Sequence, residues 1–234
     1  MPREARPRLE IRSGAAAFAI ADVARARGAQ LVVLGGREHG LLARGLGRST
    51  AHYLVRTLDV PLLVVAQPRE PFTRILTALD LSDTSVPTLK TAERFAHLLH
   101  GELRIAHIVE PLRLMYLPIA PFDQEGFAER SREGLDRLLA PLAPVVRENA
   151  VVRTGPTAAT IIEEATAWRA DLVVVGSHGK GLVDRLLLGS TTERLLNALP
   201  TSLLVVPAAV PARHAAKRRV ARKAKKTAKK TVRR

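Results

Sequence analysis

The sequence predicts a doubly wound α/β fold, in which helices cover both faces of a parallel sheet. Short aliphatic runs alternate along the 234 residues with stretches of helical periodicity, a pattern typical of parallel strands joined by right-handed crossovers. The sequence also repeats itself: a shift of 141 residues aligns residues 12–65 with 153–206 without a gap, and 23 of these 54 positions are identical. Residues from about 74 to 150 have no counterpart before residue 12. We therefore expect a half domain over residues 1–68, a complete domain over 72–208 and a tail over 209–234.

The complete domain supplies five expected strands. They cover residues 75–79, 103–109, 150–153, 172–175 and 203–206. The last two are unbroken aliphatic runs, which suit strands buried on both faces. Helical patterns cover residues 85–100, 122–140, 157–169 and 190–199. A cluster of Ser82, Asp83 and Ser85 is expected to cap the first of these helices.

The first copy repeats only part of this series. Its expected strands cover residues 8–12, 30–35 and 61–66, and its expected helices cover 15–27 and 49–58. A lone half domain would expose a sheet edge. Residues encoded upstream of Met1 are one economical explanation for the missing strands.

Composition excludes several functional classes. The chain has no cysteine, which excludes disulfides, thiolate metal sites and cysteine nucleophiles. Aromatic residues make up 3% of the chain, too few for an RNA reader that stacks bases. No apolar run approaches the ~18 residues of a membrane-spanning helix. We expect a cytoplasmic protein without a membrane span, with nucleoid association as an alternative.

Positive charge is concentrated in the tail. The whole chain has 37 Lys and Arg residues and 22 Asp and Glu residues. Twelve of the Lys and Arg residues lie in residues 213–234, which contain no Asp or Glu. We expect this segment to be disordered when free and to bind nucleic acid or another polyanion without sequence preference, through release of counterions. A solubilising or membrane-surface role, or no selected role, are the alternatives. The residues expected to contact the polyanion are Lys217, Arg218, Arg219, Arg222, Lys223, Lys225, Lys226, Lys229, Lys230, Arg233 and Arg234.

A glycine motif follows the expected strand at 172–175. The sequence continues Gly176-Ser177-His178-Gly179, and after nine intervening residues Gly189-Ser190-Thr191 opens a helical pattern. Glycines let backbone N–H groups approach an anion, and a helix N-terminus offers further unpaired N–H groups. The spacing matches neither the Rossmann dinucleotide fingerprint nor a Walker loop. A tight turn without a ligand is the alternative reading.

At these residues the chain resembles the universal stress protein family, whose nucleotide-binding members carry Gly-x2-Gly-x9-Gly-Ser/Thr in a five-stranded sheet of order 3-2-1-4-5. Ala78-Leu79-Asp80-Leu81-Ser82 matches the family's opening, and residues 104–109 resemble its second strand. The resemblance implies binding of ATP, with Mg²⁺ as an accompanying ion. It implies that Asp80 contacts the ribose or adenine side, and that the backbone near Ile108 and Val109 holds adenine. The implied nucleotide-binding residues are Asp80, Ile108, Val109, Gly176, Ser177, His178, Gly179, Gly189, Ser190 and Thr191.

The first copy departs from this motif. Gly35 matches Gly176, but Glu38 and Arg48 replace the glycines that correspond to Gly179 and Gly189. A carboxylate there would repel phosphate, so we expect no nucleotide in this copy. The resemblance further implies that segments 61–66 and 202–206 pair with each other, within one chain or between two copies.

The function expected from these features is that of an ATP-binding regulatory or stress-response protein with a polyanion-binding tail. No Ser/His/Asp triad, paired-carboxylate spacing or metal-ligand set stands out in the sequence, so we expect no catalytic residues and at most slow ATP hydrolysis. Two alternatives stay open: a nucleoid-associated scaffold that binds no nucleotide, and an ATP-dependent enzyme of the same α/β class.

Overall fold

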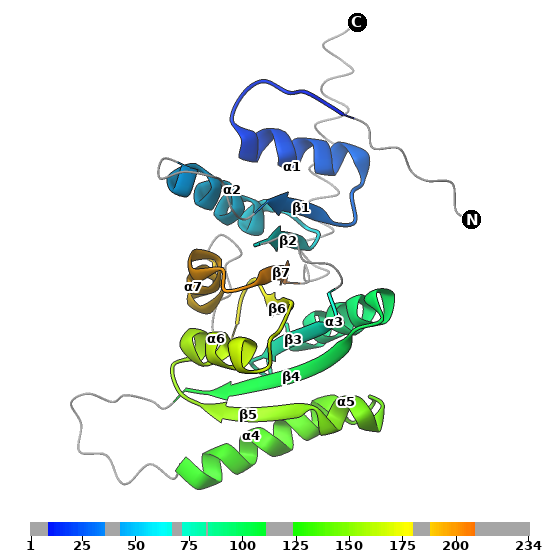
Figure 1. The fold of residues 1–234 in the computed structure, drawn as a ribbon, viewed down its shortest axis with the longest axis vertical. Coiled ribbons are helices and arrows are strands. Elements are labelled where there is room, and N and C mark those ends of the chain that lie inside the picture. The colour runs from blue at the N-terminus through cyan, green and yellow to red at the C-terminus, as the bar shows by residue number, and fades with distance from the viewer. Residues whose placement is uncertain are drawn as a thin grey trace, which may run out of the picture.

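The computed structural model describes residues 9–35, 43–66, 72–82, 84–110, 124–179 and 188–208 (Figure 1). Within these residues, strands form one sheet in the order β1-β2-β7-β6-β3-β4-β5. The strands are β1 (Val32–Gly35), β2 (Leu62–Val65), β3 (Arg74–Leu79), β4 (Glu102–Val109), β5 (Ala150–Thr154), β6 (Leu172–Gly176) and β7 (Ser202–Val206). The helices are α1 (Ala16–Arg27), α2 (Ala43–Thr57), α3 (Ser85–Leu99), α4 (Gln124–Leu139), α5 (Pro144–Glu148), α6 (Thr157–Ala167) and α7 (Ser190–Ala198).

The predicted fold class is confirmed. Strands β3 to β7 form a parallel sheet in the order β5-β4-β3-β6-β7, which is 3-2-1-4-5 when these five strands are numbered along the chain. The short helix α5 was not expected from the sequence. None of the helices in the described ranges is both long and apolar enough to cross a membrane.

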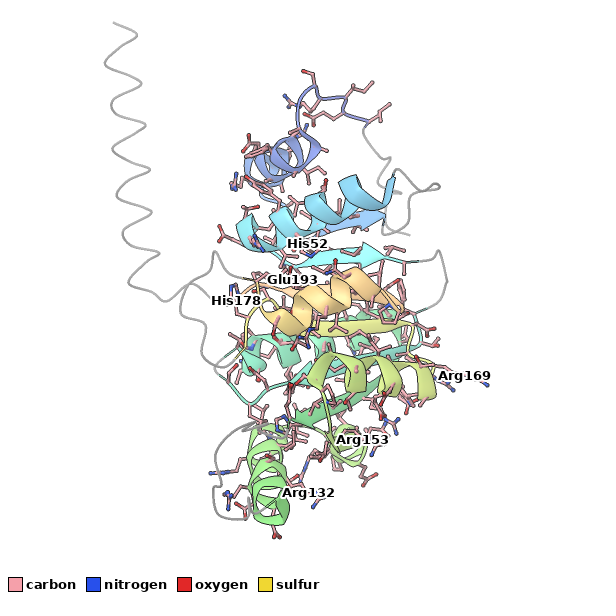
Figure 2. All side chains as sticks on the ribbon, turned by 90° about the vertical axis from the view of Figure 1, so that its left-hand side faces the viewer. His52, Arg132, Arg153, Arg169, His178 and Glu193 are labelled. Atoms are coloured by element: carbon pink, nitrogen blue, oxygen red, sulfur yellow. The ribbon has the colours of Figure 1, made fainter. Side chains whose placement is uncertain are left out.

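Helices cover both faces of this sheet. Helices α1, α2, α6 and α7 pack on one face and enclose a core that includes Leu54, Ile161 and Leu195. Figure 2 shows these helices on the face toward the viewer, in the order α1, α2, α7 and α6 from top to bottom. Helices α3 and α4 pack on the opposite face, where Leu89 and Leu135 are buried. Both faces of β6 are therefore covered, which explains its unbroken run of aliphatic residues.

The sequence repeat is also a structural repeat. Strand β1 pairs with β2, and Val32 lies opposite Leu62. Strand β6 pairs with β7, and Val173 lies opposite Leu203. The two pairs have the same register, because adding 141 to the residue numbers of the first gives those of the second. The two copies meet where β2 pairs antiparallel with β7 and Leu63 lies opposite Leu204. Because the shift carries Leu63 onto Leu204, a local twofold axis passes between these two residues. The segments 61–66 and 202–206 thus pair within the chain.

The prediction of a strand at residues 8–12 is wrong over residues 9–12, which the structure describes. Residues 9–13 form no strand, and the side chains of Leu9 and Ile11 are almost fully exposed. Their counterparts in the repeat lie in β5, which pairs with β4. The first copy contains no counterpart of β4, so this segment lacks the neighbour that would give it a hydrogen-bonded ladder.

Candidate functional site

A cavity of about 410 Å³ lies at the carboxyl ends of β3, β4 and β6. In doubly wound sheets this is the edge at which ligands bind. The first turns of α6 and α7 complete its wall. Of the ten candidate nucleotide-binding residues, nine line this cavity: Asp80, Ile108, Val109, Gly176, His178, Gly179, Gly189, Ser190 and Thr191.

Asp80 follows the last residue of β3 and is held in one orientation. Its Oδ1 atom accepts hydrogen bonds from the Ser82 backbone N–H at 3.1 Å, the Ser82 hydroxyl at 2.6 Å and the Ser85 hydroxyl at 3.0 Å. Its Oδ2 atom faces the glycine loop, because a Cβ atom placed on Gly179 would lie only 2.8 Å from it. The carboxylate and the glycine loop therefore meet across the cavity, as the sequence predicts.

The same hydrogen bonds correct the expected helix cap. The N-cap residue of α3 is Thr84, and it makes no side-chain cap hydrogen bond. Ser82 and Ser85 instead donate to Asp80, because its charged carboxylate is a stronger acceptor than neutral groups. Asp83 lies outside the described residues.

The loop after β6 is anchored through its carbonyl groups. The carbonyl of Gly176 accepts from the Thr192 hydroxyl at 2.7 Å, that of Ser177 from the Gly189 N–H at 3.0 Å, and that of His178 from the Thr84 hydroxyl at 3.1 Å. In a planar trans peptide the N–H group points opposite to the carbonyl. The N–H groups that follow the Ser177 and His178 carbonyls therefore point away from these protein donors.

Helix α7 begins beside this loop. A Cβ atom on Gly189, its N-cap residue, would lie 3.3 Å from the Ser177 carbonyl oxygen, so glycine lets the helix start close to the loop. The first hydrogen bond along the helix joins the Glu193 N–H to the Gly189 carbonyl at 2.9 Å. N–H groups of the first turn have no acceptor inside a helix and carry a partial positive charge. Ser190 and Thr191 therefore present an anion-attracting helix end to the cavity.

Ser177 does not line the cavity. Its buried hydroxyl is 2.8 Å from His178 Nδ1 and accepts a hydrogen bond from the Ala208 backbone N–H at 3.1 Å. In Figure 2 His178 lies to the left of α7. The hydroxyl of Ser177 thus orients the His178 ring and ties the glycine loop to the residue that follows β7 by two positions.

The end of β4 forms another wall of the cavity. Ile108 and Val109 are buried there, and the carbonyl of Val109 accepts a hydrogen bond from the Gly155 N–H at 3.0 Å. Both residues line the cavity, and apolar side chains of this kind suit the flat face of a nucleobase.

Sequence reasoning missed Glu110 and Thr157, which also line the cavity. The Glu110 Oε2 atom accepts from the Thr157 hydroxyl at 2.5 Å and from the Thr157 backbone N–H at 3.3 Å. The hydrogen bond from the Thr157 hydroxyl is the main cause that lowers the pKa of Glu110 below its usual value. The hydrogen bond from the Thr157 backbone N–H and the positive charge of Arg194 lower this pKa further. Glu110 follows the last residue of β4 as Asp80 follows β3, and this position was a signal that could have identified it.

The charge balance of the cavity constrains its ligand. Among the described residues that line it, Asp80 and Glu110 are carboxylates, and none is Lys or Arg. Backbone N–H groups and hydroxyls of these described residues are donors that an anionic ligand can use. Described His, Asp and Glu side chains form no group of three suited to hold a metal ion.

Comparison with known proteins identifies relatives of this chain. A family model described as the universal stress protein family matches residues 2–66 and 71–207. The universal stress protein Rv2005c of Mycobacterium tuberculosis is 33% identical over 181 residues, which cover 73% of this chain and 59% of that protein. The chain thus spans less than two thirds of the length of this relative.

A solved structure with the same fold is also found. The crystal structure of the functionally unknown protein PA1789 from Pseudomonas aeruginosa PAO1 superposes with a TM-score of 0.65 and 21% identity, covering 84% of this chain and 69% of that one. A universal stress protein solved in complex with cAMP covers 59% of this chain and 98% of its own, with 24% identity and a TM-score of 0.40.

Proposed function

The chain belongs to the universal stress protein family, and from that premise we propose that residues 72–208 bind an adenine nucleotide, ATP in particular. The observation that carries this proposal is the meeting of Asp80 with the glycine loop around one cavity of about 410 Å³. Both parts of the family motif thus face the same space.

The phosphates are proposed to lie against the glycine loop and the start of α7. Backbone N–H groups after the Ser177 and His178 carbonyls and in the first turn of α7 supply the donors. The hydroxyls of Ser190 and Thr191 can add hydrogen bonds to phosphate oxygens. Mg²⁺ bound to the nucleotide would add positive charge beside the phosphates.

The ribose and base are proposed to extend from Asp80 toward the end of β4. A carboxylate accepts hydrogen bonds, so Asp80 suits ribose hydroxyls better than phosphates. Ile108 and Val109 then lie beside the base. The first copy is proposed not to bind nucleotide, because Glu38 and Arg48 replace the two glycines, although neither side chain lies within the described residues.

Isothermal titration calorimetry with ATP, ADP, AMP and cAMP tests the proposal. We expect micromolar binding of ATP, and its loss in Gly179→Glu, which places a second carboxylate beside Asp80. Gly35→Glu is the matched control: it adds the same side chain at the last residue of β1, where a Cβ atom meets nothing within 4 Å. Absence of nucleotide binding by the wild-type chain would contradict the proposal and leave the scaffold function. Unchanged ATP binding in Gly179→Glu would contradict the assigned site.

We also propose that the tail over residues 209–234 binds nucleic acid or another polyanion. Twelve Lys and Arg residues without an acid in residues 213–234 favour this function, although the segment lies outside the described residues. Gel-shift measurements on the full chain and on a chain that ends at residue 212, each at two salt concentrations, test it. We expect DNA binding that weakens steeply with salt and disappears with the tail. Equal affinity of the two chains would contradict this assignment.

A further inference from the structure

The strand order places the parts of the cavity in a line along the sheet edge. Strand β3 lies between β6 and β4, so the glycine loop, Asp80 and Glu110 follow one another at the ends of three adjacent strands. Neighbouring strands are about 4.8 Å apart, which puts the ends of β6 and β4 roughly 10 Å from each other. A nucleotide with its phosphates at the glycine loop therefore brings its base toward the end of β4.

Glu110 is the fixed charge at that end. Its Oε2 atom is engaged by both the hydroxyl and the backbone N–H of Thr157, the first residue of α6. These contacts restrain the carboxylate and leave Oε1 to accept a further hydrogen bond. An ionised carboxylate has no proton to donate, so it can only accept.

We infer that Glu110 selects purines that carry an amino group at position 6 over purines that carry a carbonyl there. This inference rests on the proposed nucleotide site and names a specificity-determining residue within it. The 6-amino group of adenine donates to the Glu110 carboxylate. In the same pose, with position 6 rather than N1 facing Glu110, the 6-carbonyl oxygen of hypoxanthine or guanine places a second acceptor against the carboxylate and is repelled.

The same charge fixes the direction in which the nucleotide binds. The negative charge of Glu110 repels phosphates from the end of β4, whereas the N–H groups of the glycine loop and α7 attract them. The cavity therefore accepts the nucleotide in one orientation, with the base at β4 and the phosphates at α7.

ATP and ITP give the sharpest comparison, because the two differ only in the group at position 6 of the purine and in the proton that ITP carries on N1. A hydrogen bond to a charged group strengthens binding, and because Glu110 is exposed we expect a modest gain, about tenfold tighter binding of ATP than of ITP. In Glu110→Gln the amide can either accept or donate, so we expect the ratio of ATP to ITP affinity to fall to about one. Titration calorimetry on the full chain measures both.

Two further variants separate selection from simple stabilisation. Glu163→Gln, an exposed carboxylate on α6 outside the cavity, is the matched control and should keep the wild-type ratio. Thr157→Val removes the hydroxyl that restrains Glu110 and should lower the ratio, whereas Thr157→Ser should keep it. If Glu110 serves only to hold the start of α6, Glu110→Gln will lower thermal stability without changing the ratio.

The possible outcomes also separate this inference from the proposed function. If wild-type protein binds ATP and ITP equally well, or if Glu110→Gln keeps the wild-type ratio, the inference is wrong while the nucleotide site stands. If the wild-type chain binds neither nucleotide, both the site and the inference fail.

Discussion

The contact between Gly179 and Asp80 can be tested by adding a single methyl group. In Gly179→Ala the new Cβ atom would lie 2.8 Å from Asp80 Oδ2, closer than real Cβ atoms approach an oxygen. Asp80 can retreat only by disturbing the hydrogen bonds that Ser82 and Ser85 donate to Oδ1. Overpacking of this kind costs about 1–3 kcal/mol. We therefore expect a loss of that size in the free energy of unfolding.

A double-mutant cycle measured by urea denaturation isolates this contact. Asp80→Ala removes the carboxylate, so adding Gly179→Ala in that background should cost less than about 0.5 kcal/mol. The control Gly35→Ala should also lie within about 0.5 kcal/mol of wild type, since its Cβ atom meets nothing within 4 Å. If Gly179→Ala costs the same with and without Asp80, the cost does not arise from the carboxylate and the reasoning is refuted.

Two other perturbations follow from the charged groups. Glu164 is buried and accepts hydrogen bonds from Arg104 Nη1 at 2.8 Å and Arg153 Nε at 3.0 Å. In urea denaturation Glu164→Gln should therefore lower the free energy of unfolding by up to about 3 kcal/mol, whereas Glu163→Gln, at an exposed position, should not. Equal stability of the two variants would contradict this expectation. The pKa of Glu110 is lowered from 4.5, so its contribution to stability is present above pH 4.5 and is lost as the pH falls through the lower pKa of the folded protein. Thermal denaturation between pH 3 and 6 should show part of the acid sensitivity disappear in Glu110→Gln, and an identical pH profile in the variant would argue against the Thr157 contact.

The sequence predicted the sheet well where residue type alone decides the strand. Strand β6 is buried on both faces, so its aliphatic run could not be mistaken for an exposed strand or a loop. The repeat was visible in the sequence, and the structure shows that the 141-residue shift carries the β1–β2 pairing onto the β6–β7 pairing. The segment at residues 8–12 was misassigned because a strand also needs a neighbour, and local sequence does not report whether one is present.

The site was predicted from strand ends and glycine spacing, whereas its remaining features depend on contacts between residues that are distant in the sequence. Asp80, Gly176 and Gly179 were identifiable because they lie at or just after the ends of strands that the sequence marks clearly, and Gly189 because it precedes a helical pattern. The inward turn of Ser177 was not, because its hydrogen bond to the Ala208 N–H joins residues 31 positions apart. Glu110 was missed because its pairing with Thr157 depends on how α6 begins beside β4, which is a tertiary contact.

A crystal structure of the full chain grown with ATP and Mg²⁺ tests the central claim most directly. We expect one nucleotide per chain, with its phosphates against the loop from Gly176 to Gly179 and the first turn of α7, and its base at the end of β4 beside Glu110. A nucleotide bound elsewhere on the chain, or bound here with its phosphates at β4, would contradict the account.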